Sequence, residues 1–204
     1  MEVKNLRYLR NGKPLFGPVS FNTDKNPLIL IKGRNGVGKS TLLKVILGIE
    51  RCKEGQVIWK KSEAVGYVPD SSEQYFVGMT SESLFQFLKN QFAISDDVFE
   101  NRLSELVEYF QFPMKKFGQI IQTLSLGERK KIMLIVSFVI NPDLIIMDEP
   151  FSGLDEKSLD SLNFLIREYL KKGKSFIIVN HGNTNFTAEE SVVIDLGDKK
   201  QCQL

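Results

Sequence analysis

The sequence GRNGVGKS at residues 33–40 decides the fold class, because it fits the G-x-x-x-x-G-K-[S/T] pattern of a phosphate-binding loop. Its glycines let the backbone curl until successive N–H groups point at one anion. Lys39 is then placed against the outer phosphates of a nucleotide, and Ser40 offers a hydroxyl to Mg²⁺. The residues that we expect to bind the nucleotide in this loop are Gly33, Asn35, Gly36, Gly38, Lys39, Ser40 and Thr41.

The sequence on either side of this loop fits the same interpretation. The apolar run 28–31 predicts a buried strand that enters the loop, and residues 40–47 predict a helix that leaves it and ends at Gly48. A bound phosphate would then lie at the N-terminus of a helix, where backbone N–H groups favour an anion. The alternative, a glycine-rich turn with an accidental lysine, gives no reason for the strand and the helix beside it.

Length and composition narrow the class of protein. The chain has 204 residues, enough for one domain with a full core. Its net charge of +2 gives no electrostatic argument for a nucleic-acid partner. Cys52 and Cys202 are far apart and predict neither a zinc site nor a disulfide framework. Residues 132–140, the longest apolar run, are too few to span a bilayer, and residues 1–7 lack a secretory signal. We therefore expect a soluble, cytoplasmic protein.

Turn signals separate short apolar runs along most of the chain. Residues 1–32 predict a small antiparallel layer that leads into the loop strand. Residues 71–140 predict helices instead, one opening at Ser83 with a capping box to Gln86 and one with apolar residues at helical spacing over 99–110. Further strands are predicted at residues 55–59, 64–68, 144–147, 175–179 and 192–196, and an amphipathic helix over 159–169.

Strands that alternate with helices around one phosphate loop predict an α/β fold with a mostly parallel, covered sheet. We expect a single domain over residues 1–204. Residues 1–70 and 141–204 would form the nucleotide-binding core, with the antiparallel layer at its N-terminal side. Residues 71–140 would form an inserted helical lobe.

A pair of acidic residues follows the buried strand at residues 144–147. Asp148 would stand at the carboxyl end of a parallel strand, facing the nucleotide crevice, where it can hold Mg²⁺. Glu149 is placed one residue further, to orient or deprotonate the attacking water. A solvated turn is the alternative for Asp-Glu-Pro, but the fully apolar strand before it favours the crevice.

Three more motifs complete a pattern. The sequence LSLGE at 124–128 stands before a predicted helix, SGLD at 152–155 follows the acidic pair, and His181 follows a predicted strand. With the phosphate loop and the acidic pair, the chain resembles the ATP-binding cassette family over nearly its whole length. LSLGE corresponds to the family signature Leu-Ser-Gly-Gly-Gln, SGLD to its D-loop and His181 to its switch histidine. Five motifs in the family order are very specific.

The resemblance implies a mechanism. Two cassettes would close head to tail, so that ATP and Mg²⁺ held by Lys39 and Ser40 of one subunit are capped by Ser125 and Gly127 of the other. A neutral His181 would hydrogen-bond the γ-phosphate, although a lone histidine is often structural. Ser125 would also cap its own helix. For Asp155, an ordinary helix start and an inter-subunit contact both remain open.

The sequence departs from the family pattern at three places. Leu126 replaces a signature glycine and Glu128 its glutamine, while the second glycine is retained. Asp70 stands where the family places a glutamine, with Gln74 a poorer fit by register. Asp70 can still serve Mg²⁺, but it adds a negative charge beside the catalytic glutamate. The third concerns adenine, which the family stacks on an aromatic residue; here Tyr8 and Arg10 compete for that role.

The resemblance implies the ATP-hydrolysing subunit of a membrane transporter, which powers a separately encoded permease and sits on the inner face of the membrane through it. A bare cassette of this length is similar to subunits of exporters. Its partners would be that permease and a second, identical or paired cassette, with no nucleic acid. Two alternatives are a soluble cassette ATPase acting on ribosomes or DNA, and an ATP-dependent regulator. The permease would dock near residues 70–88, where the apolar residues Tyr75, Phe76, Val77 and Met79 are either exposed or buried beneath the lobe.

Overall fold

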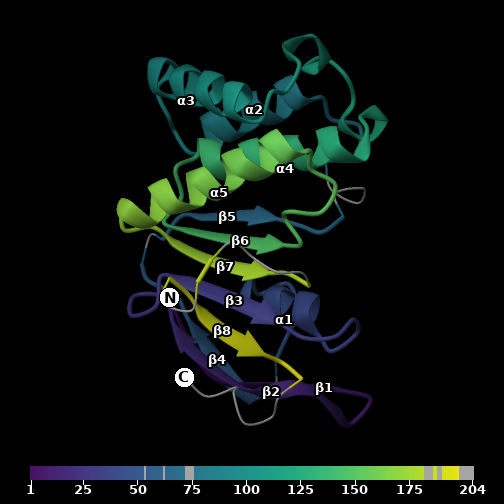
Figure 1. Cartoon of the computed structure of the whole chain (residues 1–204), viewed down its shortest axis with the longest axis vertical. Helices are drawn as coiled ribbons and strands as arrows, with labels where there is room; N and C mark the ends of the chain where they lie inside the picture. The colour runs from purple at the N-terminus through teal and green to yellow at the C-terminus, as the bar shows by residue number, and fades with distance from the viewer. Residues whose placement is uncertain (53, 62, 72–75, 182–185, 188–189, 198–204) are drawn as a thin grey trace.

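The computed structural model describes the chain except residues 53, 62, 72–75, 182–185, 188–189 and 198–204. The described part has an α/β fold in which strands and helices alternate around the phosphate loop (Figure 1). The strands are β1 (Glu2–Arg10), β2 (Lys13–Asn22), β3 (Leu28–Lys32), β4 (Glu54–Ile58), β5 (Val65–Val68), β6 (Leu144–Asp148), β7 (Ser175–Val179) and β8 (Val192–Asp195). The helices are α1 (Lys39–Ile46), α2 (Ser81–Gln91), α3 (Asp96–Tyr109), α4 (Leu126–Val139) and α5 (Glu156–Lys171), with short 3₁₀ turns η1 (Met114–Lys116) and η2 (Ile121–Thr123).

A parallel sheet of five strands, in the order β5-β6-β7-β3-β8, forms the centre. All five residues of β6 and of β7 are buried, which is why both sequences are nearly continuous apolar runs. The strand that enters the phosphate loop, β3, pairs with β7 on one side and β8 on the other. The mostly parallel sheet and the buried strands at 28–31 and 144–147 are therefore confirmed.

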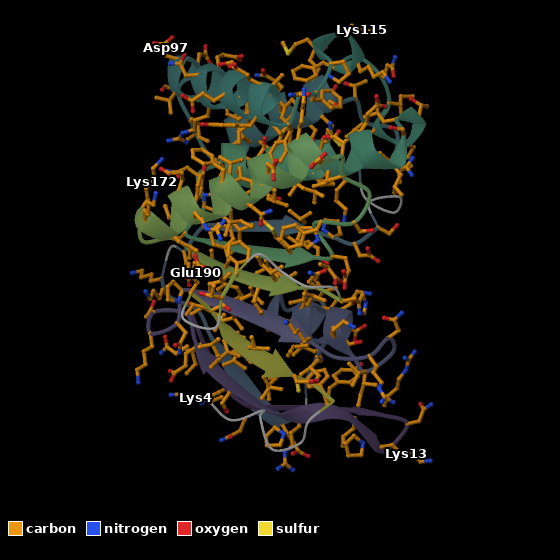
Figure 2. The ribbon with its side chains drawn as sticks, in the orientation of Figure 1. Lys4, Lys13, Asp97, Lys115, Lys172 and Glu190 are labelled. Carbon is orange, nitrogen blue, oxygen red and sulfur yellow. The ribbon has the colours of Figure 1, made fainter. Side chains whose placement is uncertain are left out.

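A second sheet of three antiparallel strands, in the order β2-β1-β4, lies at the end of the molecule opposite α2 and α3 (Figure 1). Residues 1–32 supply only two of its strands, and the third, β4, follows the phosphate-loop helix in sequence. The predicted antiparallel layer is confirmed, but it draws on a later segment than the sequence indicated. In Figure 2, Lys13 of this sheet and Lys115 of η1 lie at opposite ends of the molecule.

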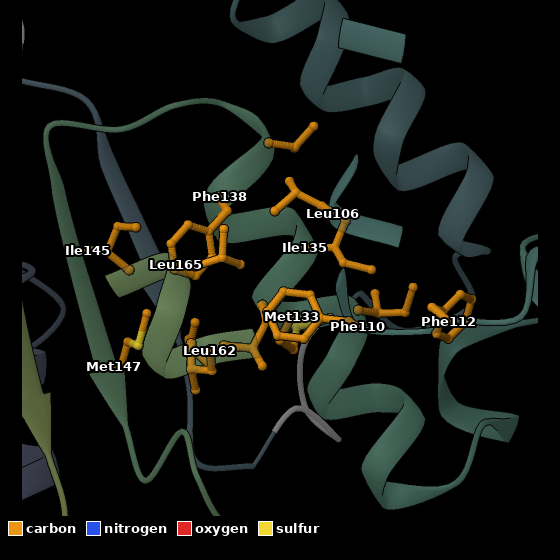
Figure 3. Packing of buried hydrophobic residues seen from close by; sticks show 14 of the residues in the cluster. Leu106, Phe110, Phe112, Met133, Ile135, Phe138, Ile145, Met147, Leu162 and Leu165 are labelled. Atoms are coloured by element: carbon orange, nitrogen blue, oxygen red, sulfur yellow. The ribbon is translucent and has the colours of Figure 1, made fainter. Parts of the chain in front are cut away.

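Helix α4 is packed on both sides. Figure 3 shows its side chains Met133, Ile135 and Phe138 between residues of the parallel sheet and residues of α3. Buried residues of α2, α3, α4, α5 and one face of the parallel sheet form a single apolar cluster. The division into a core and an inserted lobe over residues 71–140 stays a prediction, because α4 belongs as much to the sheet as to the other helices.

The start of α2 differs from the prediction. Thr80 is its N-cap residue, and the Thr80 side chain accepts a hydrogen bond of 3.1 Å from the backbone N–H of Ser83. The capping box predicted at Ser83 is therefore wrong, since Ser83 already lies inside the first turn. An isolated bridge between Thr80 and Ile120 fixes the chain one residue before the helix. Within the described ranges, no helix is both long and apolar enough to cross a membrane.

Candidate nucleotide site

The lysine of the phosphate loop is hydrogen-bonded to the backbone of the same loop. The Lys39 ammonium donates hydrogen bonds to the carbonyl oxygens of Gly33, at 2.9 Å, and Arg34, at 3.1 Å, and only 6% of the residue is exposed. Gly38 precedes α1 at a φ of 107°, and a Cβ there would lie 2.9 Å from side-chain atoms of Leu15 and Phe16. No side chain caps α1, so the first N–H groups of the helix remain open to a ligand.

A cavity of about 340 Å³ lies in front of this loop and gathers residues from widely separated segments. Most residues predicted to bind phosphate and Mg²⁺ in this chain line the cavity, together with Glu149 and His181, which are predicted to act in hydrolysis. Its lining is Arg10, Leu15, Asn35, Gly36, Gly38, Lys39, Ser40, Thr41, Asp70, Asp148, Glu149 and His181. Gly33 lies at the edge of a neighbouring cavity, with Arg34 and Asn35.

Oxygen atoms in this cavity fit a divalent cation. Asp148 ends β6 and is 3% exposed; burial raises the pKa of its carboxyl, the charge of Asp70 raises it further, and a hydrogen bond from Ser40 lowers it. The described residues hold no group of three or more His, Cys, Asp or Glu placed to cage a metal. Mg²⁺ needs no such cage, because it binds through one or two protein oxygens together with substrate phosphates and water. Ser40, Asp148 and Asp70 fit that requirement.

Glu149 and His181 meet at the carboxyl ends of adjacent strands. The imidazole Nε2 of His181 lies 3.0 Å from Oε1 of Glu149, and the backbone N–H of His181 donates to Oε2 at 3.3 Å. Burial raises the pKa of Glu149, while the contacts with His181 lower it. The backbone of Glu149 has a φ of 49°, which is uncommon outside glycine and concentrates at functional sites. This geometry presents a carboxylate to the cavity beside a histidine.

Lys130 is a site residue that the sequence did not indicate. Its ammonium donates to the carbonyl oxygens of Pro69 at 3.2 Å, Asp70 at 3.2 Å and Glu149 at 3.1 Å. The residue is 5% exposed, and burial lowers its pKa, while the charges of Asp70, Asp148 and Glu149 raise it. Its position in a basic run gave no signal, because such a run is usually solvated.

The signature residues lie outside this cavity. Ser125 caps α4 by accepting from the N–H of Glu128 at 3.3 Å, and the Glu128 carboxylate accepts from the Ser125 N–H at 3.1 Å, which completes a capping box. Leu126 is 58% exposed, and a Cβ on Gly127 would lie 2.9 Å from the carbonyl oxygen of Gly153. The predicted N-cap role of Ser125 is present, and none of the residues 124–128 lines the cavity at the chain's own phosphate loop.

Asp155 begins α5. Its side chain accepts from the N–H of Ser158 at 2.9 Å and lies 2.6 Å from the Lys131 ammonium. Hydrogen bonds from Lys131 and from Ser158 hold the pKa of Asp155 far below its usual value. The helix-start interpretation of Asp155 thus has direct contacts within the chain. The inter-subunit contact stays a prediction.

The two candidates for the adenine contact occupy different places. Arg10 lines the cavity. Tyr8 stacks on Phe16 with ring centroids 5.9 Å apart, and its hydroxyl donates to Glu50 at 3.3 Å. Among the described residues, this leaves Arg10 and Leu15 as the side chains of the antiparallel sheet that border the cavity. Gln74 and Tyr75 lie outside the described residues.

Comparison with known proteins identifies the family. The family model described as ABC transporter matches residues 16–152. The chain is 32% identical to the zinc import ATP-binding protein ZnuC of Rickettsia prowazekii, over 84% of this chain and 71% of that one. It is 27% identical to the cytochrome c biogenesis ATP-binding export protein CcmA of Vibrio cholerae, over 98% of this chain and 100% of that one. A solved ATP-binding subunit of an ABC transporter superposes with a TM-score of 0.82 at 25% identity, over 96% of this chain and 85% of that one. The chain therefore belongs to the ABC transporter family, as an ATP-binding cassette and ATPase subunit.

Proposed function

We propose that this cassette binds Mg·ATP in the cavity at the phosphate loop and hydrolyses it to power a separately encoded membrane permease. The observation that carries the proposal is the convergence of Lys39, Ser40, Asp148, Glu149 and His181 on one cavity from three separate segments. Phosphoryl transfer depends mainly on positioning and charge neutralisation, and these five side chains supply both.

Each side chain has a role that its geometry supports. Lys39 holds the loop in shape through two carbonyl oxygens and presents its charge to the outer phosphates. Ser40 and Asp148 would hold Mg²⁺, with Asp70 beside them, and the ion would neutralise charge on the phosphate oxygens. Glu149 orients the attacking water and accepts its proton, because burial keeps the carboxylate basic. His181, whose Nε2 lies 3.0 Å from Glu149, would hydrogen-bond the γ-phosphate.

A second cassette completes the site. Ser125 and Gly127 do not line the chain's own cavity, which supports a role in contacting a nucleotide held by another subunit. The Ser125 oxygen accepts a hydrogen bond within its own helix, but its O–H remains able to donate to a γ-phosphate. We therefore propose a head-to-tail pair, each subunit capping the ATP of the other, as identical chains or as two related cassettes.

The direction of transport separates the two named relatives, since one is an import protein and the other an export protein. We propose export, because the alignment with the export protein runs over its whole length whereas the import protein is matched over 71%. The cassette would then lie at the inner face of the membrane, bound to its permease.

The docking segment can be narrowed by the structure. Phe76 and Met79 are partly buried against the apolar cluster of the helices, whereas Val77 is 74% exposed. Charging Val77 is therefore the cleaner test of the permease surface. We expect Val77→Glu to weaken membrane association and to spare ATP binding. Val98→Glu, at an exposed valine of α3, is the matched control and should change neither.

The permease itself is best identified by gentle detergent extraction of the tagged cassette, followed by identification of the integral membrane protein that copurifies. An integral protein that is retained by wild type, lost in Val77→Glu and retained in Val98→Glu supports the proposal. Copurification of ribosomes or DNA in its place would favour the alternative of an ATPase acting on those assemblies and would overturn the transporter assignment.

A further inference from the structure

Lys130 is a buried cation in the second turn of α4, between two partly exposed basic neighbours. Burying an ammonium is costly unless its hydrogens are all accepted by nearby oxygens. Lys130 meets this condition, because its three donors match three carbonyl oxygens at 3.1–3.2 Å. These oxygens are all backbone atoms, so the lysine fixes chain geometry and neutralises no carboxylate directly.

The three carbonyls belong to the two loops that carry the catalytic carboxylates. Pro69 and Asp70 follow β5, and Glu149 follows β6. Lys130 donates to the carbonyl oxygen of Glu149, whose φ of 49° belongs to neither a standard right-handed helix nor a strand. Regular secondary structure therefore does not fix the direction of this peptide group, and the contact with Lys130 helps to hold it. The lysine also stands five residues after Ser125 on the same helix. One side chain therefore joins the signature helix to both loops.

We propose that Lys130 is a positioning residue that holds the loops of Asp70 and Glu149 to the signature helix, so that the Glu149 carboxylate is aligned for hydrolysis when a partner's nucleotide engages that helix. This rests on the proposed role of Glu149. Lys130 does not line the cavity and touches no nucleotide-binding residue of the phosphate loop. Its effect should therefore fall on the rate of hydrolysis and leave ATP affinity nearly unchanged.

Two substitutions separate the hydrogen bonds from the bulk of the side chain. Lys130→Met keeps the length of the stem and removes every donor, while Lys130→Gln keeps two donors without the charge. Displacing a catalytic group by about 1 Å costs on the order of 100-fold in rate. We expect Lys130→Met to lower kcat by about that factor with KM for ATP within about two-fold of wild type. Lys130→Gln should recover part of kcat.

The matched control is Lys174→Met. Lys174 also donates to a backbone carbonyl, that of Asn141, and to Asp143, but it does so at the opposite end of β6 from Glu149. A purely structural loss at a lysine of this kind should lower the melting temperature and leave kcat unchanged. Melting curves of all variants, with and without ATP, place the kinetic effects beside stability.

A double-mutant cycle with Glu149→Gln decides whether Lys130 acts through Glu149. If it does, Lys130→Met lowers the residual rate of the Glu149→Gln protein far less than it lowers the wild-type rate. Equal losses in the two backgrounds would overturn the proposal, as would wild-type kcat in folded Lys130→Met. A rise in KM that matches the fall in kcat/KM would also overturn it. Normal hydrolysis by Glu149→Gln would instead remove the proposed role of Glu149, so the two failures are distinguishable. Should Lys130→Met not fold, Lys130→Gln carries the same cycle.

Discussion

The N-termini of α1 and α4 both contain glycine, but they differ in how their first backbone N–H groups are satisfied. Before α1, Gly38 adopts a φ of 107° and no side chain caps the helix. The first residues of α1 line the cavity, and their N–H groups have no capping side chain as acceptor. Before α4, the side chains of Ser125 and Glu128 bond each other's backbone N–H groups in a closed capping box. One N-terminus keeps its donors for a ligand, and the other satisfies two of them internally.

This difference fits the proposal that each nucleotide site is completed by residues of two chains. The α1 loop has a lysine, a cavity and oxygen ligands around it, and can cradle phosphates without help. The α4 loop presents an exposed Leu126 and a serine O–H, and none of its residues lines the cavity at the phosphate loop. The serine O–H can therefore add a contact to a nucleotide that the phosphate loop of another subunit already holds.

The largest effect that separates the two loops is expected from Lys39→Ala. Removing this ammonium deletes the charge against the phosphates and the bonds that keep the loop closed, so ATP affinity should fall by about 100-fold and hydrolysis should stop. Nucleotide binding measured beside a melting curve checks this. Lys44→Ala, at an exposed lysine in the last turn of the same helix, should bind ATP normally. Unchanged affinity in folded Lys39→Ala would contradict the phosphate-loop assignment.

A smaller effect is expected at the closed N-terminus. Lys116 lies 2.6 Å from the Glu128 carboxylate and lowers its pKa, so the negative charge in the signature is paired. Lys116→Met leaves that charge facing the partner's phosphates, which should weaken the ATP-dependent dimer by about two- to five-fold. Adding Glu128→Gln should restore it. Analytical ultracentrifugation in the Glu149→Gln background measures the change, and Lys115→Met is the control. No recovery on adding Glu128→Gln would mean that charge is not the cause.

The smallest effect is expected from substituting Asp155, the N-cap residue of α5. Its pKa is lowered in the folded chain, mainly by Lys131, so its charge stabilises the fold above the usual carboxyl pKa of 3.8, and that contribution is lost as the pH falls further. Because the Asp155 side chain is 57% exposed, the gain is below about 1 kcal/mol. Urea unfolding should show Asp155→Asn less stable than wild type at neutral pH, with the gap closing toward about pH 2. A constant gap would contradict the ion-pair origin.

Local patterns made much of this site predictable. The phosphate loop needs glycines and a lysine at fixed spacing, and the acidic pair follows an apolar strand, so each could be read from a few adjacent residues. The structure brings these predicted residues to one cavity. Buried parallel strands were equally legible, because both faces of β6 and β7 are covered.

Features that depend on distant segments could not be read in this way. Lys130 is bound by carbonyls 19 to 61 residues away, and nothing beside it in sequence distinguishes it from its partly exposed basic neighbours. The N-cap of α2 is Thr80 and not the predicted Ser83, and a bridge between Thr80 and Ile120 sets the direction of the chain there. Likewise, β4 joins the antiparallel sheet by pairing with β1, which its own mostly exposed sequence does not indicate.

The central claim, that the open loop of one subunit and the closed loop of another share one ATP, is tested most directly with Glu149→Gln. This substitution keeps Asp148 for Mg²⁺ and removes the carboxylate that polarises water, so ATP should bind and persist. We expect size-exclusion chromatography with Mg·ATP to show a dimer of Glu149→Gln. The dimer should be absent without nucleotide and when Ser125→Arg is added to block the capping surface. Ser95→Arg, at the exposed N-cap position of α3, should leave the dimer intact. An ATP-dependent dimer that survives Ser125→Arg, or normal hydrolysis by Glu149→Gln, would contradict the account.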